Sequence, residues 1–201
     1  MEPTVEIHRL FDLMPASARM MNKIISKPEQ AKVIDTSFPL PWNWERLICI
    51  NFDLWRRLNK SQRDLLLLQT VSWLTAVKWF KPDIYQVIAL AGLLGGVVEF
   101  LQTDALGVVI AGGLTTLAGF RITAINRSQQ LQLNADETAI EVAQRRGYSK
   151  VEAAQHLLSA IEAVAKIEGN AALDFTELIR CQNLRAIAGL SSIGVPNGYD
   201  N

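Results

Sequence analysis

The sequence predicts a mainly helical α+β fold in a single domain, residues 1–201, interrupted by an apolar segment at 84–120. Three observations support this prediction. Long stretches carry apolar residues at helical spacing, two short β-type apolar runs lie between residues 31 and 52, and the segment 84–120 contains no lysine or arginine. A chain of 201 residues is long enough to bury a hydrophobic core.

The N-terminal half combines helices with short strands. Residues 4–26 have the apolar spacing of a helix that Pro15 interrupts. Short strands are expected at 31–35 and 46–52, and they predict a small sheet of two or three strands. A long apolar helix follows over about residues 61–80.

The C-terminal half is expected to be helical. A polar helix is predicted over 121–146. Ser149 and Glu152 form the signature of a capping box, so a second helix should occupy 150–168. After a break at Gly169, a last helix should end near residue 187.

The apolar segment consists of two runs, 84–101 and 105–120, joined by a short polar turn. Each run is near the lower limit of the roughly 17–25 residues that a membrane-spanning helix needs. We favour a transmembrane hairpin, and a hairpin buried inside protein is the alternative. Basic residues flank the segment on both sides, which predicts cytoplasmic termini. Small residues suit close packing of the two membrane helices: Gly92, Gly96, Gly112 and Thr116.

Two blocks on either side of this segment share the pattern of one family. Residues 47–73 read as a strand, a turn and an apolar helix that ends in Gln69-Thr70-Val71-Ser72-Trp73. Residues 128–155 contain Gln132, the pair Ala135-Asp136 and the pair Gly147-Tyr148. Together these blocks resemble the HtpX-like integral-membrane zinc metalloproteases, in which H-E-x-x-H and a later glutamate bind zinc. The resemblance implies a gluzincin-like helical core.

On that pattern, Gln69 to Trp73 occupy the H-E-x-x-H positions and Gln132 occupies the position of the third ligand. These side chains are unsuited to catalytic zinc. Glutamine offers only a weak amide oxygen, Thr70 cannot act as a base at neutral pH, and Trp73 only donates hydrogen bonds. We therefore expect no metal, no cofactor and no proteolysis, which makes the chain a pseudoprotease rather than an enzyme.

The resemblance also predicts a geometry. Gln69 and Trp73 should face Gln132 across a cleft, because the ligands of the family converge from two helices on one metal. Asp136 corresponds to a residue that supports a zinc-bound imidazole. With no imidazole to orient, Asp136 should pair with a hydroxyl or a basic side chain.

The composition excludes nucleic acid as a partner, since lysine plus arginine equals aspartate plus glutamate at 20 each, with no basic tract. Several stretches resemble a cyanobacterial family of unknown function, among them FDLMPASARM, FPLPW and FTELIRCQNLR. That resemblance implies a thylakoid or plasma membrane setting, with photosynthetic complexes as clients.

We therefore expect a non-catalytic protein that is anchored in the lipid bilayer and binds or assembles membrane proteins. A structural subunit of a membrane complex is one alternative. The other is an enzyme with different chemistry, for which the candidate carboxylates are Asp136, Glu137 and Glu141, together with Glu99 or Asp104.

Overall fold

The computed structural model describes residues 2–39, 45–77 and 129–190, together with Ala91, Leu94, Gly113 and Thr116. The chain divides into two units. The first, called the core unit below, comprises Met1–Ala76 and Gln132–Asn201, and the second comprises Val77–Leu131. Each unit is considered by itself.

The predicted hairpin at 84–120 falls in the second unit, almost entirely outside the described residues. Of its expected packing residues, Gly92, Gly96 and Gly112 are not described, and Thr116 is a helical, exposed residue. Within the described part of the chain, no helix is both long enough and apolar enough to cross a membrane.

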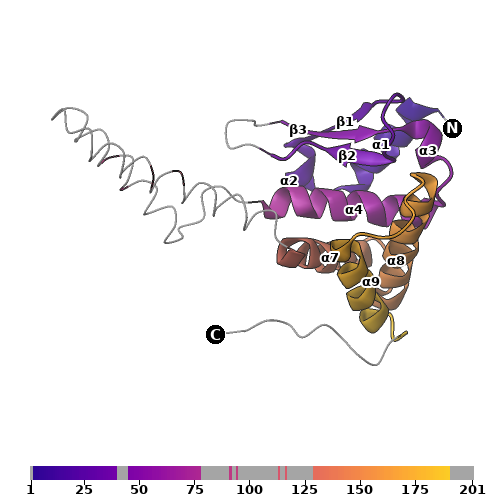
Figure 1. The fold of residues 1–201 in the computed structure, drawn as a ribbon. Coiled ribbons are helices and arrows are strands. Elements are labelled where there is room, and N and C mark those ends of the chain that lie inside the picture. Colours follow the sequence, from indigo (N-terminus) through magenta and orange to yellow (C-terminus); the bar gives the residue numbers. More distant parts are fainter. Residues whose placement is uncertain are drawn as a thin grey trace. The chain divides into compact units, whose positions relative to one another are not determined.

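A three-stranded sheet lies on one side of the core unit (Figure 1), in agreement with the predicted α+β class. The strands are β1 (Asn22–Ser26), β2 (Ile34–Thr36) and β3 (Arg46–Ile50). Strand β3 is central, with β1 parallel and β2 antiparallel to it.

Residues 22–26 form strand β1, although the sequence pattern placed them at the end of a helix. Ile24 and Ile25 are β-branched, and they pair in register with Ile48 and Cys49 of β3. The side chain of Asn22 donates a 2.8 Å hydrogen bond to the carbonyl of Ala18, where the preceding helix ends. Strand pairing therefore overrides the local helical spacing.

Seven described helices accompany the sheet. Phe52 was predicted to end a strand but begins a helix, because the side chain of Asn51 accepts hydrogen bonds from the backbone N–H groups of Asp53 and Leu54. The helices are α1 (Pro3–Leu13), α2 (Ala16–Arg19), α3 (Phe52–Trp55), α4 (Lys60–Ala76), α7 (Gln129–Gln144), α8 (Lys150–Ile167) and α9 (Phe175–Ile187).

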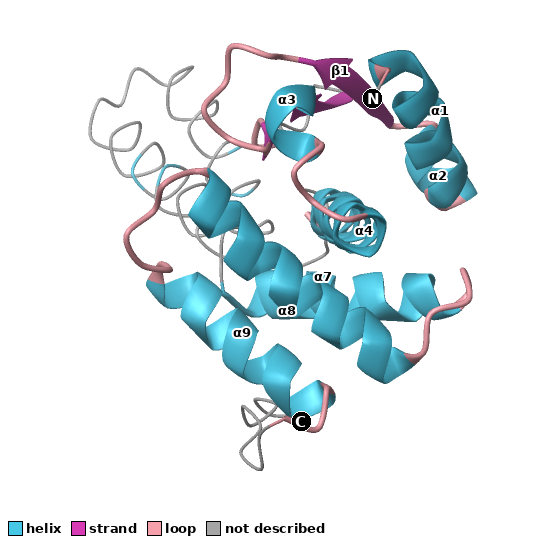
Figure 2. Cartoon of the chain, turned by 90° about the vertical axis from the view of Figure 1, so that its right-hand side faces the viewer, coloured by secondary structure: helices cyan, strands magenta, loops and turns pink. Residues whose placement is uncertain are grey.

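Helix α4 is the centre of the core unit. Figure 2 shows it nearly end-on, with the sheet and α1 on one side and α7, α8 and α9 on the other. Leu67 and Val71 belong to the cluster of buried residues that includes the strands, whereas Leu65 and Leu68 belong to the cluster formed with α7, α8 and α9. A helix packed on both sides is apolar nearly all round, which explains the run of four leucines in α4.

The ends of the C-terminal helices follow the predicted capping chemistry. Ser149 and Glu152 form a reciprocal capping box at the start of α8, as expected. Asp174 forms a second capping box with Glu177 at the start of α9. Gly147 has a φ of 96° in the turn after α7, a conformation that glycine adopts without strain.

Candidate functional site

Gln69 of α4 and Gln132 of α7 meet through their side chains. The Nε2 of Gln69 donates a 3.0 Å hydrogen bond to the Oε1 of Gln132. These two residues are called the amide clasp below. They are 63 positions apart in the sequence, and the expectation that they converge is confirmed.

The amide clasp lies in a cleft of about 330 Å³. Thr70 and Trp73 line the same cleft, so α4 presents all the residues expected there from the sequence. The hydroxyl of Thr70 donates to the carbonyl of Leu66 in its own helix at 2.8 Å. This bond leaves the hydroxyl proton directed at the helix backbone.

Trp73 packs against the loop that follows β2. Its ring lies edge-to-face against Phe38, with centroids 6.2 Å apart. The indole Nε1 is buried and has no hydrogen-bond partner in the described part of the chain. Leaving such a donor unpaired costs about 1–3 kcal/mol. Trp73 therefore serves as an apolar wall of the cleft.

Asp136 lies one turn after Gln132 and is fully buried. The guanidinium of Arg180, in α9, donates two hydrogen bonds to its carboxylate, at 2.8 Å from Nε and 2.7 Å from Nη2. The expectation that Asp136 pairs with a hydroxyl or a basic side chain is thus confirmed. Burial raises the pKa of Asp136, while the charge and hydrogen bonds of Arg180 oppose that shift. The carboxylate is held by this pair and is turned away from solvent.

Charged residues form the rim of the cleft. Lys32 Nζ and Asp35 Oδ1 form an exposed ion pair at 2.9 Å. The carboxylate of Glu168 accepts a 2.7 Å hydrogen bond from the backbone N–H of Val33, and burial raises its pKa. In the described ranges of the chain, no group of three or more histidine, cysteine, aspartate or glutamate side chains is arranged to hold a metal ion.

The three carboxylates considered for other enzyme chemistry do not form one cluster. Asp136 is enclosed in the core, whereas Glu137 and Glu141 are exposed. The remaining candidates, Glu99 and Asp104, lie outside the described residues.

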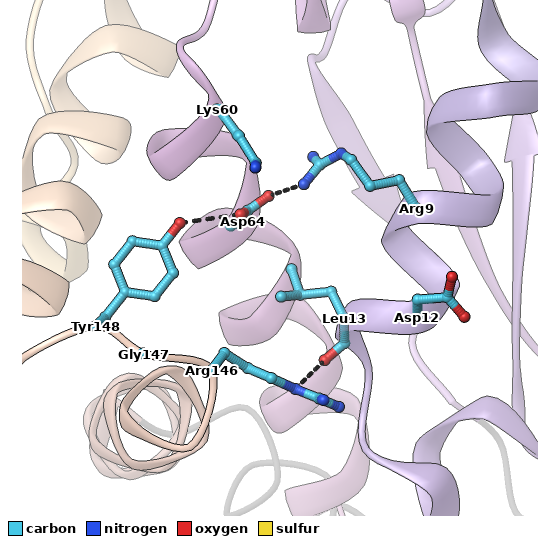
Figure 3. A pocket seen from close by; sticks show the side chains of 8 residues that line it. All are labelled: Arg9, Asp12, Leu13, Lys60, Asp64, Arg146, Gly147 and Tyr148. Carbon is cyan, nitrogen blue, oxygen red and sulfur yellow. Dashed lines mark hydrogen bonds and ion pairs between the residues drawn. The ribbon is translucent and has the colours of Figure 1, made fainter.

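A second polar centre joins α1, α4 and the turn between α7 and α8 (Figure 3). Asp64, buried in α4, accepts hydrogen bonds from Arg9 Nη1 at 2.5 Å and from the hydroxyl of Tyr148 at 3.0 Å. Arg9 also binds both carboxylate oxygens of Glu6, at 2.9 and 2.8 Å. Burial alone would raise the pKa of Glu6, but the hydrogen bonds and the charge of Arg9 lower this pKa below its ordinary value.

The neighbouring pocket, of about 350 Å³, is lined in part by these residues. Arg146, at its edge, donates to the carbonyls of Leu13 and Met14 at 3.1 Å each and so satisfies the end of α1. The polar groups of this centre form hydrogen bonds with one another. We interpret the bond from Tyr148 to Asp64 as the structural role of the Gly147-Tyr148 pair.

Sequence reasoning missed four residues of these two centres: Glu6, Arg9, Asp64 and Arg180. One of them left a signal. Asp64 is an acidic residue at the head of the leucine run of α4, and a carboxylate on a helix that is buried all round must be paired. No comparable signal identifies Arg180, because its partner lies 44 positions away.

The fold and the site together define an α+β domain that surrounds one buried helix and carries a cleft closed by an amide pair. The model of the family described as protein of unknown function (DUF3318) matches residues 8–148. This match covers more than half of the chain, and the chain belongs to that family. The matched region contains the amide clasp and Asp136 but ends before α8 and α9, and thus before Arg180. No curated protein and no solved structure matches the chain.

Proposed function

We propose that this protein is a non-catalytic binding or assembly module, anchored in a membrane, that holds extended segments of unassembled membrane proteins. Its frame derives from an inactivated HtpX-like, gluzincin-type metalloprotease. The observation that carries the proposal is the amide clasp, because it occupies the cleft at the positions where that family holds zinc.

The clasp leaves one amide oxygen and one NH₂ group without a partner among the described residues. Each glutamine side chain has an amide oxygen and an NH₂ group, and one hydrogen bond joins the pair. Gln69 Oε1 and Gln132 Nε2 have no further partner among the described residues, and neither atom is enclosed by protein. Exchanging N and O in both amides would again leave one acceptor and one donor. This is the complement of a peptide group, which offers one N–H and one C=O.

The residues at the positions of the family's zinc ligands and catalytic base do not supply the groups that would cleave a bound peptide. Both amides are neutral, the Thr70 hydroxyl donates to its own helix, and Asp136 is engaged by Arg180. None of these groups can activate water as a general base at neutral pH. Binding without hydrolysis is the chemistry that these side chains support.

Membrane attachment rests on the sequence of residues 84–120. This segment is apolar, contains no lysine or arginine, and lies between α4 and α7 in the chain. We propose that it enters the lipid bilayer as a hairpin with both termini cytoplasmic, in a thylakoid or plasma membrane. Clients would then be membrane proteins or photosynthetic complexes.

Site-specific photo-crosslinking in cells tests the binding function. A photoreactive residue is placed at Lys32, on the rim of the cleft, and at Lys27 as a control that is exposed but does not line the cleft. We expect crosslinks to integral membrane proteins at 32 and not at 27, and fewer of them when Gln69→Leu and Gln132→Leu are combined. Equal crosslinking at both positions, or crosslinks to soluble proteins alone, would contradict the proposal.

Alkaline carbonate extraction tests the anchor separately. We expect the full-length protein to stay with the membrane pellet. Its complete release would contradict membrane insertion and would favour the buried hairpin, while leaving the cleft to be judged by the crosslinks.

A further inference from the structure

A third pocket, of about 540 Å³, lies between α7, the start of α8 and α9. It shares no lining residue with the cleft of the amide clasp. Glu137, Ile140 and Glu141 line it from one face of α7, and Asn183 and Ile187 line it from one face of α9. Its volume is within the range of about 300–1,000 Å³ that is typical of ligand sites.

Asn183 is the residue that points to a ligand. Asn183 is only 8% exposed, and its side chain makes no hydrogen bond to any described residue. Asn183 lines the pocket, and neither polar atom of its amide is sealed inside protein. The amide has no protein partner in the described residues, so only water can satisfy it, and a ligand with a suitable hydrogen-bonding group can replace that water.

The charge of the pocket is negative. Glu137 and Glu141 are exposed at its wall, and neither forms an ion pair with a described residue, although Arg145 lies one turn after Glu141. Lys150, across the pocket at the start of α8, supplies one positive charge against the two carboxylates. Ile140, which is buried, and Ile187 give the pocket an apolar floor.

We propose that this pocket binds a cationic alkyl chain, that is, an ammonium or guanidinium group on a flexible methylene stem. The cation donates to the carboxylates of Glu137 and Glu141, and one further N–H donates to the amide oxygen of Asn183. The methylenes pack on Ile140 and Ile187, as the stems of lysine and arginine do on apolar surfaces. The same chemistry is offered by a basic side chain of a partner protein and by a free polyamine.

Titration of the full-length, isotope-labelled protein with n-butylguanidinium tests the inference, with the side-chain amide signal of Asn183 as the readout. The variant pair Glu137→Gln and Glu141→Gln removes the charge from two exposed positions and keeps their shape. Glu29→Gln is the matched control, because Glu29 is exposed and does not line the pocket. We expect a saturable shift of the Asn183 signal that the control retains.

In the double variant the dissociation constant should rise about tenfold or more, since hydrogen bonds to charged groups are the strong ones. Added salt should weaken binding in the same direction. The inference is overturned if Asn183 does not respond, if neutral n-butanol gives the same response, or if the double variant binds as the control does. A capped tripeptide with a central arginine and spermidine, titrated in parallel, distinguish a protein partner from a free polyamine by which of the two binds more tightly.

Discussion

The hydroxyl of Tyr148 donates a 3.0 Å hydrogen bond to Asp64, which fastens the turn between α7 and α8 to the buried helix α4. Asp64 is 3% exposed, and its other oxygen accepts from Arg9. This one carboxylate therefore connects three segments of the core unit: α1, α4 and the turn after α7.

Replacing Tyr148 by phenylalanine should lower the free energy of unfolding by about 1 kcal/mol, the usual net contribution of a hydrogen bond. Asp64→Asn should have a larger effect, because it leaves the Arg9 guanidinium without one of its two carboxylate partners. Urea unfolding of both variants and of the double variant measures the coupling. Strictly additive effects would show that the bond contributes nothing.

The Asp136–Arg180 pair should be far more sensitive to substitution than an exposed pair on the same helix. Arg180→Met leaves Asp136 buried without a partner, so we expect a loss of about 3–5 kcal/mol. Arg185 of α9 forms a 2.9 Å ion pair with Glu162, with side chains 50% and 48% exposed. Arg185→Met is therefore the matched control, and it should cost about 0–1 kcal/mol. Similar unfolding midpoints for the two variants would contradict the importance of the buried pair.

Stability should depend on pH through Glu6. Its pKa in the folded protein is lowered from the ordinary value of 4.5, so the unfolded chain binds the proton more readily than the folded one. The resulting stabilisation is fully present above pH 4.5 and is lost as the pH falls through the folded pKa. Unfolding midpoints measured as the pH is lowered should fall more steeply for the natural protein than for Glu6→Gln. Parallel curves would mean that Glu6 does not make this contribution.

The proposed descent from a metalloprotease can be tested by restoring the ligands. The natural protein should contain no stoichiometric zinc. A variant that combines Gln69→His, Thr70→Glu, Trp73→His and Gln132→Glu should bind one zinc ion, since Gln69 and Gln132 already lie within hydrogen-bond distance and Trp73 lines the same cleft. Elemental analysis after dialysis measures the bound metal.

A control for this experiment keeps Gln132 and changes only the α4 positions, and it should hold zinc more weakly because it lacks the third ligand. Equal zinc in both variants, or none in either, would argue against the inherited ligand geometry. Stoichiometric zinc in the natural protein would overturn the pseudoprotease reading.

Local chemistry made part of this structure predictable from the sequence. Ser149 with Glu152 carries its own capping signal, so the start of α8 agrees with expectation. Residues 22–26 were assigned to the wrong element because their state depends on pairing with β3, which no local spacing reveals.

The same division applies to the site. The meeting of Gln69 and Gln132 was predicted from the resemblance of two sequence blocks to a family motif, which implies that two helices converge. The partner of Asp136 and the open amide of Asn183 depend on where α9 packs, and nothing in the sequence near these residues indicates that position.

Helix α4 ends at Ala76, and Gln132 is the first residue of the core unit after the second unit. The hydrogen bond between Gln69 and Gln132 therefore joins the two ends of a long chain segment. The entropic cost of closing such a loop grows only slowly with the length of the loop. The intervening stretch can accordingly be shortened, exchanged or elaborated at little expense to the folding of the rest. Doubling the length of that stretch would add only about 0.6 kcal/mol to the entropic cost of closing the loop.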